Sequence, residues 1–157
     1  MSDPSPNVVY DCNVFVQALI NPSGPAGACL SKVRSREVRL FVSPYVLQEV
    51  REIHEKVPPK YGVTAGQTEE LAHTLASLAT VIIDIPEIYR HPIDPDDSQY
   101  INLAIVVQAP LVVSRDRHLL NLMDAGRKEG AEFKRLFPTL LILDPVEFLR
   151  ELQPKPD

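Results

Sequence analysis

The chain has few cysteines, few glycines and no long apolar run, and each shortage excludes a class of protein. Its two cysteines, Cys12 and Cys29, form neither a metal-binding motif nor a disulfide framework, so we expect buried thiols in a reducing compartment. The best candidate for a membrane segment, LAIVVQAPLVV, is broken by Gln108 and Pro110 and is too short to cross a bilayer. The start, MSDPSPN, lacks the basic and apolar regions of a signal peptide. We therefore expect a cytoplasmic protein with no membrane segment.

An excess of basic charge is also missing. The formal net charge of -5 argues against a protein that binds nucleic acid by electrostatic attraction alone. The six glycines form no phosphate-binding loop after the first apolar segment, which argues against a nucleotide-binding fold. A content of 45% hydrophobic and 24% charged residues is typical of a globular protein. With 157 residues we expect one domain over 1–152 and a disordered tail over 153–157.

Short β-branched segments alternate with longer helical patterns along the whole chain. Alternation of this kind predicts an α/β fold with a mainly parallel sheet, because parallel strands need crossover connections and the favoured crossover is a helix. We expect strands over residues 7–10, 38–42, 80–84, 111–114 and 140–143. We expect helices over residues 14–20, 26–36, 44–57, 67–78, 95–108 and 145–152, and a further helical stretch over 117–137.

Two of the helices have clear start signals. Ser43 followed by Pro44 is an N-cap and first-turn pair, and Asp94 followed by Pro95 has the same form. The two prolines that begin PPKYGVTAG end the earlier of these helices. We expect this segment, residues 58–66, to be a flexible connection.

Two acids follow strands at the positions where an open α/β sheet binds its ligands. Asp11 ends the first strand, and Asp116 lies two residues past the strand that ends in LVVS. Ligands bind such sheets outside the carboxyl ends of the strands, close to the point where the strand order reverses. Each acid taken alone is more often a turn former or an N-cap for the next helix.

Asp97 and Glu49 have an orientation that capping does not explain. At 3.6 residues per turn Asp97 lies on the same face as Ile101 and Ala104, and therefore points inward. Glu49 lies at the edge of the apolar face that contains Val46, and it is the acid of its helix best placed to reach a cleft. For Glu49 the ordinary alternative is a surface salt bridge.

Four carboxylates gathered in one cleft would repel one another at neutral pH, so a cation is needed between them. Oxygen ligands without a cluster of cysteines or histidines suit a hard divalent ion, Mg²⁺ or Mn²⁺. One or two such ions can activate a water and stabilise the leaving oxygen of a phosphodiester. The acids Asp11, Glu49, Asp97 and Asp116 therefore predict a metal-dependent hydrolase.

Read together, these segments resemble the PIN-domain ribonucleases, and among them the VapC-like toxins of toxin–antitoxin systems. VVYDCNVFVQAL is similar to the opening strand of that family with its Asp and following Asn. SPYVLQEV is similar to the family's Ser and Glu, and DPDDSQYINLA to its later Asp with an Ala seven residues on. LVVSRDRHLL resembles the strand that is followed by Thr or Ser, one residue and Asp.

The resemblance implies a three-layer α/β/α PIN-like fold whose five-stranded parallel sheet has the order 3-2-1-4-5. It implies that Asp11, Asp97 and Asp116 bind Mg²⁺ or Mn²⁺ and that Glu49 completes the acidic catalytic site. It also gives supporting roles to Asn13 and to Ser114, which stands where the family commonly has Thr. Cys12 departs from the usual Thr or Ser, and Asp94 or Asp96 could assist Asp97. RNA is the implied substrate, and an antitoxin protein and a second copy in a homodimer are implied partners.

Basic residues near the acids would have to bring RNA to an acidic protein. Arg115 and Arg117 flank Asp116 and are our candidates for phosphate contacts, whereas for His118 we expect a packing or surface role. A phosphoaspartate phosphatase is disfavoured because Asn13 stands where its second Asp is needed. The remaining alternative is a non-catalytic PIN-like domain that binds RNA or a protein.

Overall fold

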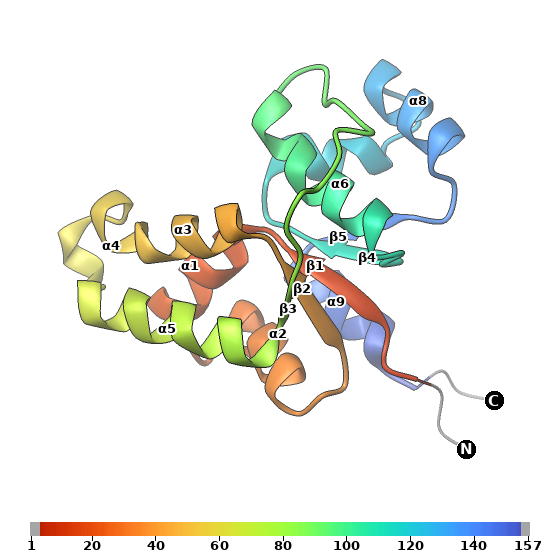
Figure 1. Cartoon of the computed structure of the whole chain (residues 1–157). Helices are drawn as coiled ribbons and strands as arrows, with labels where there is room; N and C mark the ends of the chain where they lie inside the picture. The colour runs from red at the N-terminus through yellow and green to blue at the C-terminus, as the bar shows by residue number, and fades with distance from the viewer. Residues whose placement is uncertain (1–3, 155–157) are drawn as a thin grey trace.

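Five parallel strands form the central sheet of the computed structural model, which describes residues 4–154. The strands are β1 (Asn7–Tyr10), β2 (Arg39–Val42), β3 (Thr80–Val81), β4 (Leu111–Val113) and β5 (Leu141–Leu143). All four neighbouring pairs are parallel, and the order is β3-β2-β1-β4-β5. The expected α/β/α architecture and strand order are therefore confirmed, and the order reverses between β1 and β4 (Figure 1).

Helices connect the strands and cover both faces of the sheet (Figure 1). The α-helices are α1 (Cys12–Ile20), α2 (Pro25–Arg34), α3 (Pro44–Arg51), α4 (Ile53–Lys56), α5 (Ala65–Leu78), α6 (Ser98–Val106), α7 (Arg117–Leu120), α8 (Lys128–Leu136) and α9 (Pro145–Leu152). Short 3-10 turns are η1 (Pro59–Tyr61), η2 (Pro95–Asp97) and η3 (Asn121–Met123).

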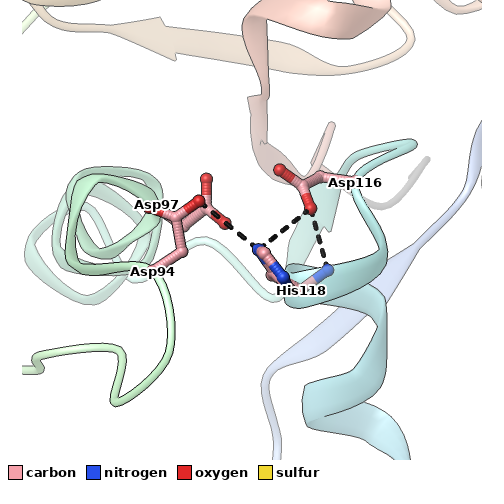
Figure 2. A group of neighbouring side chains, drawn as sticks. All are labelled: Asp94, Asp97, Asp116 and His118. Atoms are coloured by element: carbon pink, nitrogen blue, oxygen red, sulfur yellow. Dashed lines mark hydrogen bonds and ion pairs between the residues drawn. The ribbon is translucent and has the colours of Figure 1, made fainter.

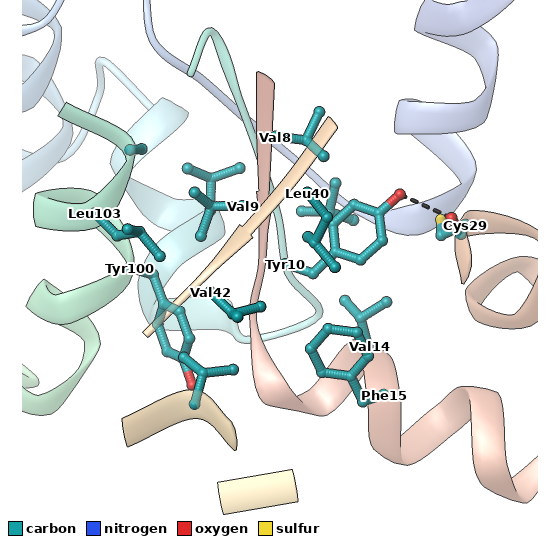
Figure 3. Close-up of a cluster of buried hydrophobic side chains, with 14 of the residues drawn as sticks. Val8, Val9, Tyr10, Val14, Phe15, Cys29, Leu40, Val42, Tyr100 and Leu103 are labelled. Atoms are coloured by element: carbon teal, nitrogen blue, oxygen red, sulfur yellow. Dashed lines mark hydrogen bonds between the residues drawn. The ribbon is translucent and has the colours of Figure 1, made fainter. Parts of the chain in front are cut away.

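The core lies on both sides of β1, because this central strand is buried on both faces. Tyr10 is 1% exposed, packs edge-on against Phe148 of α9 and donates its hydroxyl hydrogen to the Cys29 carbonyl of α2 at 2.8 Å. Leu103 of α6 packs on the opposite face (Figure 3). Both cysteines are free thiols; Cys29 is fully buried, as expected, whereas Cys12 is only partly buried. This packing fixes β1 and the residue that follows it.

The third strand is shorter than expected. Residues 80–84 look like a strand in the sequence, but only Thr80 and Val81 pair with β2. A last hydrogen bond joins the Ile82 nitrogen to the Val42 carbonyl at 2.9 Å. Asp84 then has a φ of +57°, a left-handed conformation that ends any extended strand. The chain continues without regular structure as far as η2.

Three expected helices also differ from the structure. The segment 44–57 is divided at Glu52 into α3 and α4, and 117–137 is divided into α7, η3 and α8. Asp94 stands at the expected N-cap position before Pro95, but its side chain makes no capping bond, and the first turn after it is the 3-10 turn η2. The supposed flexible segment 58–66 contains η1 and the Thr64 capping box that begins α5.

Of the tail that we expect to be disordered, Gln153 and Pro154 follow α9, and residues 155–157 lie outside the described residues. No helix within 4–154 is long and apolar enough to cross a membrane.

Candidate metal centre

The first acid of the candidate site stands at the carboxyl end of β1, beside the end of β4. The backbone nitrogen of Asp11 donates to the Val113 carbonyl of β4 at 2.9 Å, so the sheet itself sets its position. Its side chain is 6% exposed and accepts a long 3.4 Å hydrogen bond from the Asn13 nitrogen, as the N-cap of α1. Asp11 therefore both caps α1 and lies at the edge of the sheet where ligands bind.

Ser114 links Asp11 to the loop that follows the neighbouring strand β4. Its Oγ donates to Asp11 Oδ2 at 2.7 Å and accepts from the Asp116 nitrogen at 2.9 Å. Asn13 makes a second link, because its Oδ1 accepts from the Arg115 nitrogen at 3.1 Å. Ser114 is fully buried, so its bond to Asp11 is shielded from water. Both polar residues thus hold the Asp11 turn against the Asp116 loop.

Asp116 begins the short helix α7. Its Oδ1 accepts from the His118 nitrogen at 2.8 Å, which is an N-cap bond, and the side chain stays partly exposed. One carboxylate oxygen is thus used to shape the loop. The turn also places the ring of His118 beside the carboxylate, with its Nδ1 3.9 Å from Asp116 Oδ1.

Four side chains converge at this point from two distant parts of the chain. Figure 2 shows Asp94 and Asp97 projecting from the turn before α6 toward Asp116 and His118 at the start of α7. One ligand atom from each of the four lies within 4.8 Å of the others. The His118 ring nitrogen Nδ1 is 3.4 Å from Asp94 Oδ2. This group, hereafter the acidic cluster, is the part of the described chain best suited to hold a cation.

A buried histidine joins the two segments that form the acidic cluster. The Nδ1 of His91 accepts two hydrogen bonds, from the backbone nitrogens of Ile93 and Asp94, each at 3.1 Å. An acceptor nitrogen carries no hydrogen, so the hydrogen is on Nε2, which donates to the His118 carbonyl at 2.9 Å. His91 is 1% exposed. It therefore fixes the Asp94 backbone relative to that of His118.

Glu49 of α3 lies near the acidic cluster but is not part of it. Its Oε1 accepts a short 2.5 Å hydrogen bond from the hydroxyl of Tyr100, and burial raises the pKa of the Glu49 carboxyl. Among the described residues it has no ion-pair partner, so the salt-bridge alternative does not apply. Glu49 lines a cavity of about 430 Å³ together with Asp11, Asp97 and Asp116.

Burial and mutual repulsion make these carboxylates unusually basic. Burial is the main cause that raises the pKa of Asp97 to about 7, and the charges of Asp116, Asp94 and Asp11 add to it. Burial also raises the pKa of Asp11 to about 6, although the hydrogen bonds from Ser114 and Asn13 oppose the shift. A nearby cation would reverse both effects, because an opposite charge favours the ionised carboxylate.

The residues fit a hard divalent ion. Asp97 Oδ2 is buried and has no hydrogen-bond partner among the residues that the structure describes, although buried carboxylate oxygens are normally satisfied. Three carboxylates and one imidazole match the ligands of Mn²⁺, and the carboxylates alone match those of Mg²⁺. The cavity beside them leaves room for water ligands.

All four predicted acids line one cavity, but only Asp97 and Asp116 belong to the acidic cluster, where Asp94 and His118 join them. Asp97 points inward at 7% exposure, as its helical position predicts. His118 belongs to the acidic cluster instead of having only a packing or surface role, and Asp94 does too. The signal for Asp94 was its place in DPDD, whereas nothing in the sequence distinguishes His118 from a surface histidine. Arg115 and Arg117 are exposed on either side of Asp116.

An all-parallel sheet in this order, with acids where the order reverses, defines an α/β domain with the capacity to hold a metal. Comparison with known proteins agrees: residues 7–118 match the PIN domain family, and the chain belongs to it. The matched segment includes β1 to α7 and thus every acid discussed above. The chain is also 28% identical over 148 residues to a protein of Methanocaldococcus jannaschii named uncharacterized protein MJ1680, covering 93% of this chain and 91% of that protein. PIN domains are generally metal-dependent nucleases.

Proposed function

We propose that the protein is a ribonuclease that depends on Mg²⁺ or Mn²⁺ and cleaves RNA phosphodiester bonds. The observation that carries the proposal is the Asp97 carboxylate: its buried Oδ2 has no hydrogen-bond partner among the described residues, and one of its oxygens lies within 4.8 Å of ligand atoms of Asp94, Asp116 and His118. A carboxylate in this position is costly unless a cation is bound beside it.

Asp11, Asp97 and Asp116 would hold the ion, and Asp94 and His118 are placed to assist. When bound, the ion supplies positive charge that lowers the pKa of a water and stabilises the leaving oxygen. Glu49 is the fourth acid of the site. Its Oε1 is occupied by the Tyr100 hydroxyl, which leaves Oε2 to orient the attacking water and accept its proton. Ser114 and Asn13 position Asp11 and Asp116 as described above.

The exposed guanidinium groups of Arg115 and Arg117 support a phosphate-containing substrate. Among the residues that the structure describes, neither side chain is held in an ion pair, so both are free to contact the RNA on the two sides of Asp116. Such local contacts would offset the unfavourable net charge of -5. We therefore expect binding to weaken steeply with added salt.

Cleavage of a mixed RNA pool in Mn²⁺ or in EDTA tests the activity. We expect cleavage in Mn²⁺, none in EDTA, and none with Asp11→Asn or Asp97→Asn in either condition. The loss should exceed a hundredfold, because each substitution removes a charge from the ion's environment. Products can be followed by denaturing electrophoresis with a labelled pool.

The matched control is Asp84→Asn. Asp84 is an exposed acid outside the site, and its left-handed backbone tolerates Asn well. This variant should cleave RNA like the wild type. If the wild type binds RNA and Mn²⁺ but cuts nothing, the alternative of a non-catalytic binding domain is correct. Cleavage that persists in EDTA would instead point to a contaminant.

The role of a toxin in a toxin–antitoxin pair is a further part of the proposal. It rests on the resemblance of the four acidic segments to VapC-like toxins, and it implies an antitoxin protein and a homodimer as partners. The gene immediately upstream should then encode a small DNA-binding protein. Its absence would separate the nuclease from any toxin function.

A further inference from the structure

A second cavity opens at the same edge of the sheet, next to the acidic cluster but lined by other residues. Its volume is about 400 Å³, within the range of small-ligand sites. Pro25 of α2 and Val146 of α9 give it apolar walls, and Gln17, Asn21, Arg115 and Asp144 give it polar groups. We call it the Arg115 cavity.

Opposite charges face this cavity without forming an ion pair. Asp144 uses Oδ1 to accept from the Glu147 nitrogen at 2.8 Å, as the N-cap of α9, and Oδ2 makes no hydrogen bond to the described residues. Arg115 is exposed and, within 4–154, is not paired with any acid. Exposed acids and bases elsewhere in the protein do pair, such as Lys32 with Glu37 at 3.2 Å. The cavity thus offers both a strong donor and a strong acceptor to a ligand.

The position of Arg115 connects this cavity to the proposed chemistry. Its backbone nitrogen is held by Asn13 at 3.1 Å, and the next residue is Asp116 of the acidic cluster. A nucleotide adjacent to the scissile phosphate would therefore lie within reach of the Arg115 side chain. The carboxylate of Asp144 makes the cavity unsuitable for a phosphate, so the part of RNA that fits it is a base.

We propose that the Arg115 cavity binds a guanine base of the RNA substrate next to the cleavage position. Arg115 donates to guanine O6 and N7, which is the pairing that arginine makes with guanine in nucleic-acid complexes. Asp144 Oδ2 accepts from the guanine N1–H and amino group. The assignment of this base to a cleavage site rests on the proposed nuclease function, whereas the binding of guanine does not.

The other bases match the two side chains less well. Adenine has a donor, not an acceptor, at the position of O6, so its amino group would face the guanidinium. Cytosine and uracil lack the N7 acceptor, and uracil has no amino group for Asp144. Each mismatch leaves Arg115 or Asp144 without a partner in the complex, which lowers the affinity for that base. We therefore expect selection for guanine by at least tenfold.

The first experiment measures binding without metal. Wild-type protein in EDTA is titrated with the 5′-monophosphates of guanosine, adenosine, cytidine and uridine, and NMR shifts or equilibrium dialysis give the four affinities. The four share one phosphate and one sugar, so differences report the base. Asp144→Asn keeps the helix cap but removes the charge, and should reduce the preference for guanosine monophosphate about tenfold. Glu147→Gln, on the same helix and outside the cavity, should leave it unchanged.

The second experiment maps cleavage positions in a random RNA pool with Mn²⁺. Wild type and Glu147→Gln should cut next to guanine at similar rates, and the cuts made by Asp144→Asn should be distributed over all four bases. Equal affinity for the four monophosphates would overturn the proposal, whatever the protein does to RNA. Selective guanosine monophosphate binding without any RNA cleavage would keep the guanine site and reject the nuclease function.

Discussion

At the scale of single residues, Asp97 is the side chain whose position is hardest to explain by stability. Its carboxylate is 7% exposed, lacks a hydrogen-bond partner on Oδ2 and lies among other acids. It also makes no capping bond at the start of α6, so local helix stability does not require it. Function is therefore the better explanation for an acid here, since stability alone would favour a neutral side chain.

Asp97→Asn tests this conflict between stability and function. In EDTA at pH 8, where Asp97 is ionised, we expect the variant to be more stable than the wild type by about 1 kcal/mol, or roughly 2–4 °C in Tm, because a buried charge is removed. Added Mn²⁺ should raise the Tm of the wild type but not of the variant. Thermal unfolding followed by circular dichroism measures both effects.

Asp84→Asn is again the matched control, because it removes an equal charge from an exposed position. It should change the Tm by less than Asp97→Asn and leave the Mn²⁺ effect intact. A lower Tm for Asp97→Asn in EDTA would show that the acid is structurally satisfied, and the crowded-charge account would then be wrong.

At the scale of elements, the acidic cluster depends on how two segments without regular partners are held together. The chain between β3 and η2 makes no strand or helix, and α7 is a single turn. His91 joins them through bonds to Ile93, Asp94 and His118. His91 is not itself one of the candidate ligands. We expect it to control the metal affinity of the acidic cluster by holding Asp94 and His118 in position.

His91→Phe should weaken Mn²⁺ binding by more than tenfold while the protein stays folded. The ring volume is nearly kept, but two backbone N–H groups and one carbonyl lose their partner, at a cost of about 1–3 kcal/mol in stability. His54→Phe is the control, because His54 also bonds a backbone carbonyl, that of Arg51 at 2.9 Å, but bonds no residue of the acidic cluster. Mn²⁺ titration monitored by electron paramagnetic resonance gives both affinities. Equal loss of affinity in the two variants would mean that His91 is structural only.

The sequence predicts elements best where one pattern dominates. The strands β1, β4 and β5 are found within one residue of their expected bounds because they are short, apolar and flanked by turn residues. The strand predicted over residues 80–84 is too long, because a β-branched run does not indicate the left-handed conformation at Asp84. The helix predicted over 117–137 is interrupted at Asp124. The side chain of this residue accepts a hydrogen bond from the Gly126 nitrogen at 2.9 Å and forms a turn.

The candidate site was predictable to the extent that sheet and helix geometry determine it. Asp11 and Asp116 follow from the carboxyl ends of adjacent strands, and Asp97 and Glu49 from helical periodicity. Asp94 was predicted only as one of two residues that could assist Asp97, and the participation of His118 could not be predicted, because both depend on the irregular path of residues 82–94. Such a path is set by tertiary contacts such as those of His91, which no local pattern encodes.

At the scale of the whole molecule, the acidic site should make stability depend on pH in an unusual direction. The folded protein holds Asp11 with a pKa of about 6 and Asp97 with a pKa of about 7, both above the ordinary value of 3.8. A raised pKa means that the folded state binds more protons than the unfolded state between these values, so stability is lost as the pH rises. Exposed Glu37 and Glu52 have lowered pKa values, so their contribution to stability changes only below the ordinary glutamate pKa of 4.5.

We therefore expect the free energy of unfolding in EDTA to fall by about 1–3 kcal/mol between pH 4.5 and pH 7.5. Urea titrations at several pH values measure it. The double variant Asp11→Asn, Asp97→Asn should show a flatter profile, because neither amide titrates. Saturating Mn²⁺ should offset the loss above pH 6, since the ion binds the folded, deprotonated site. A wild-type profile that rises with pH in EDTA would mean that the carboxylates are individually stabilised, and the metal centre would lose its physical basis.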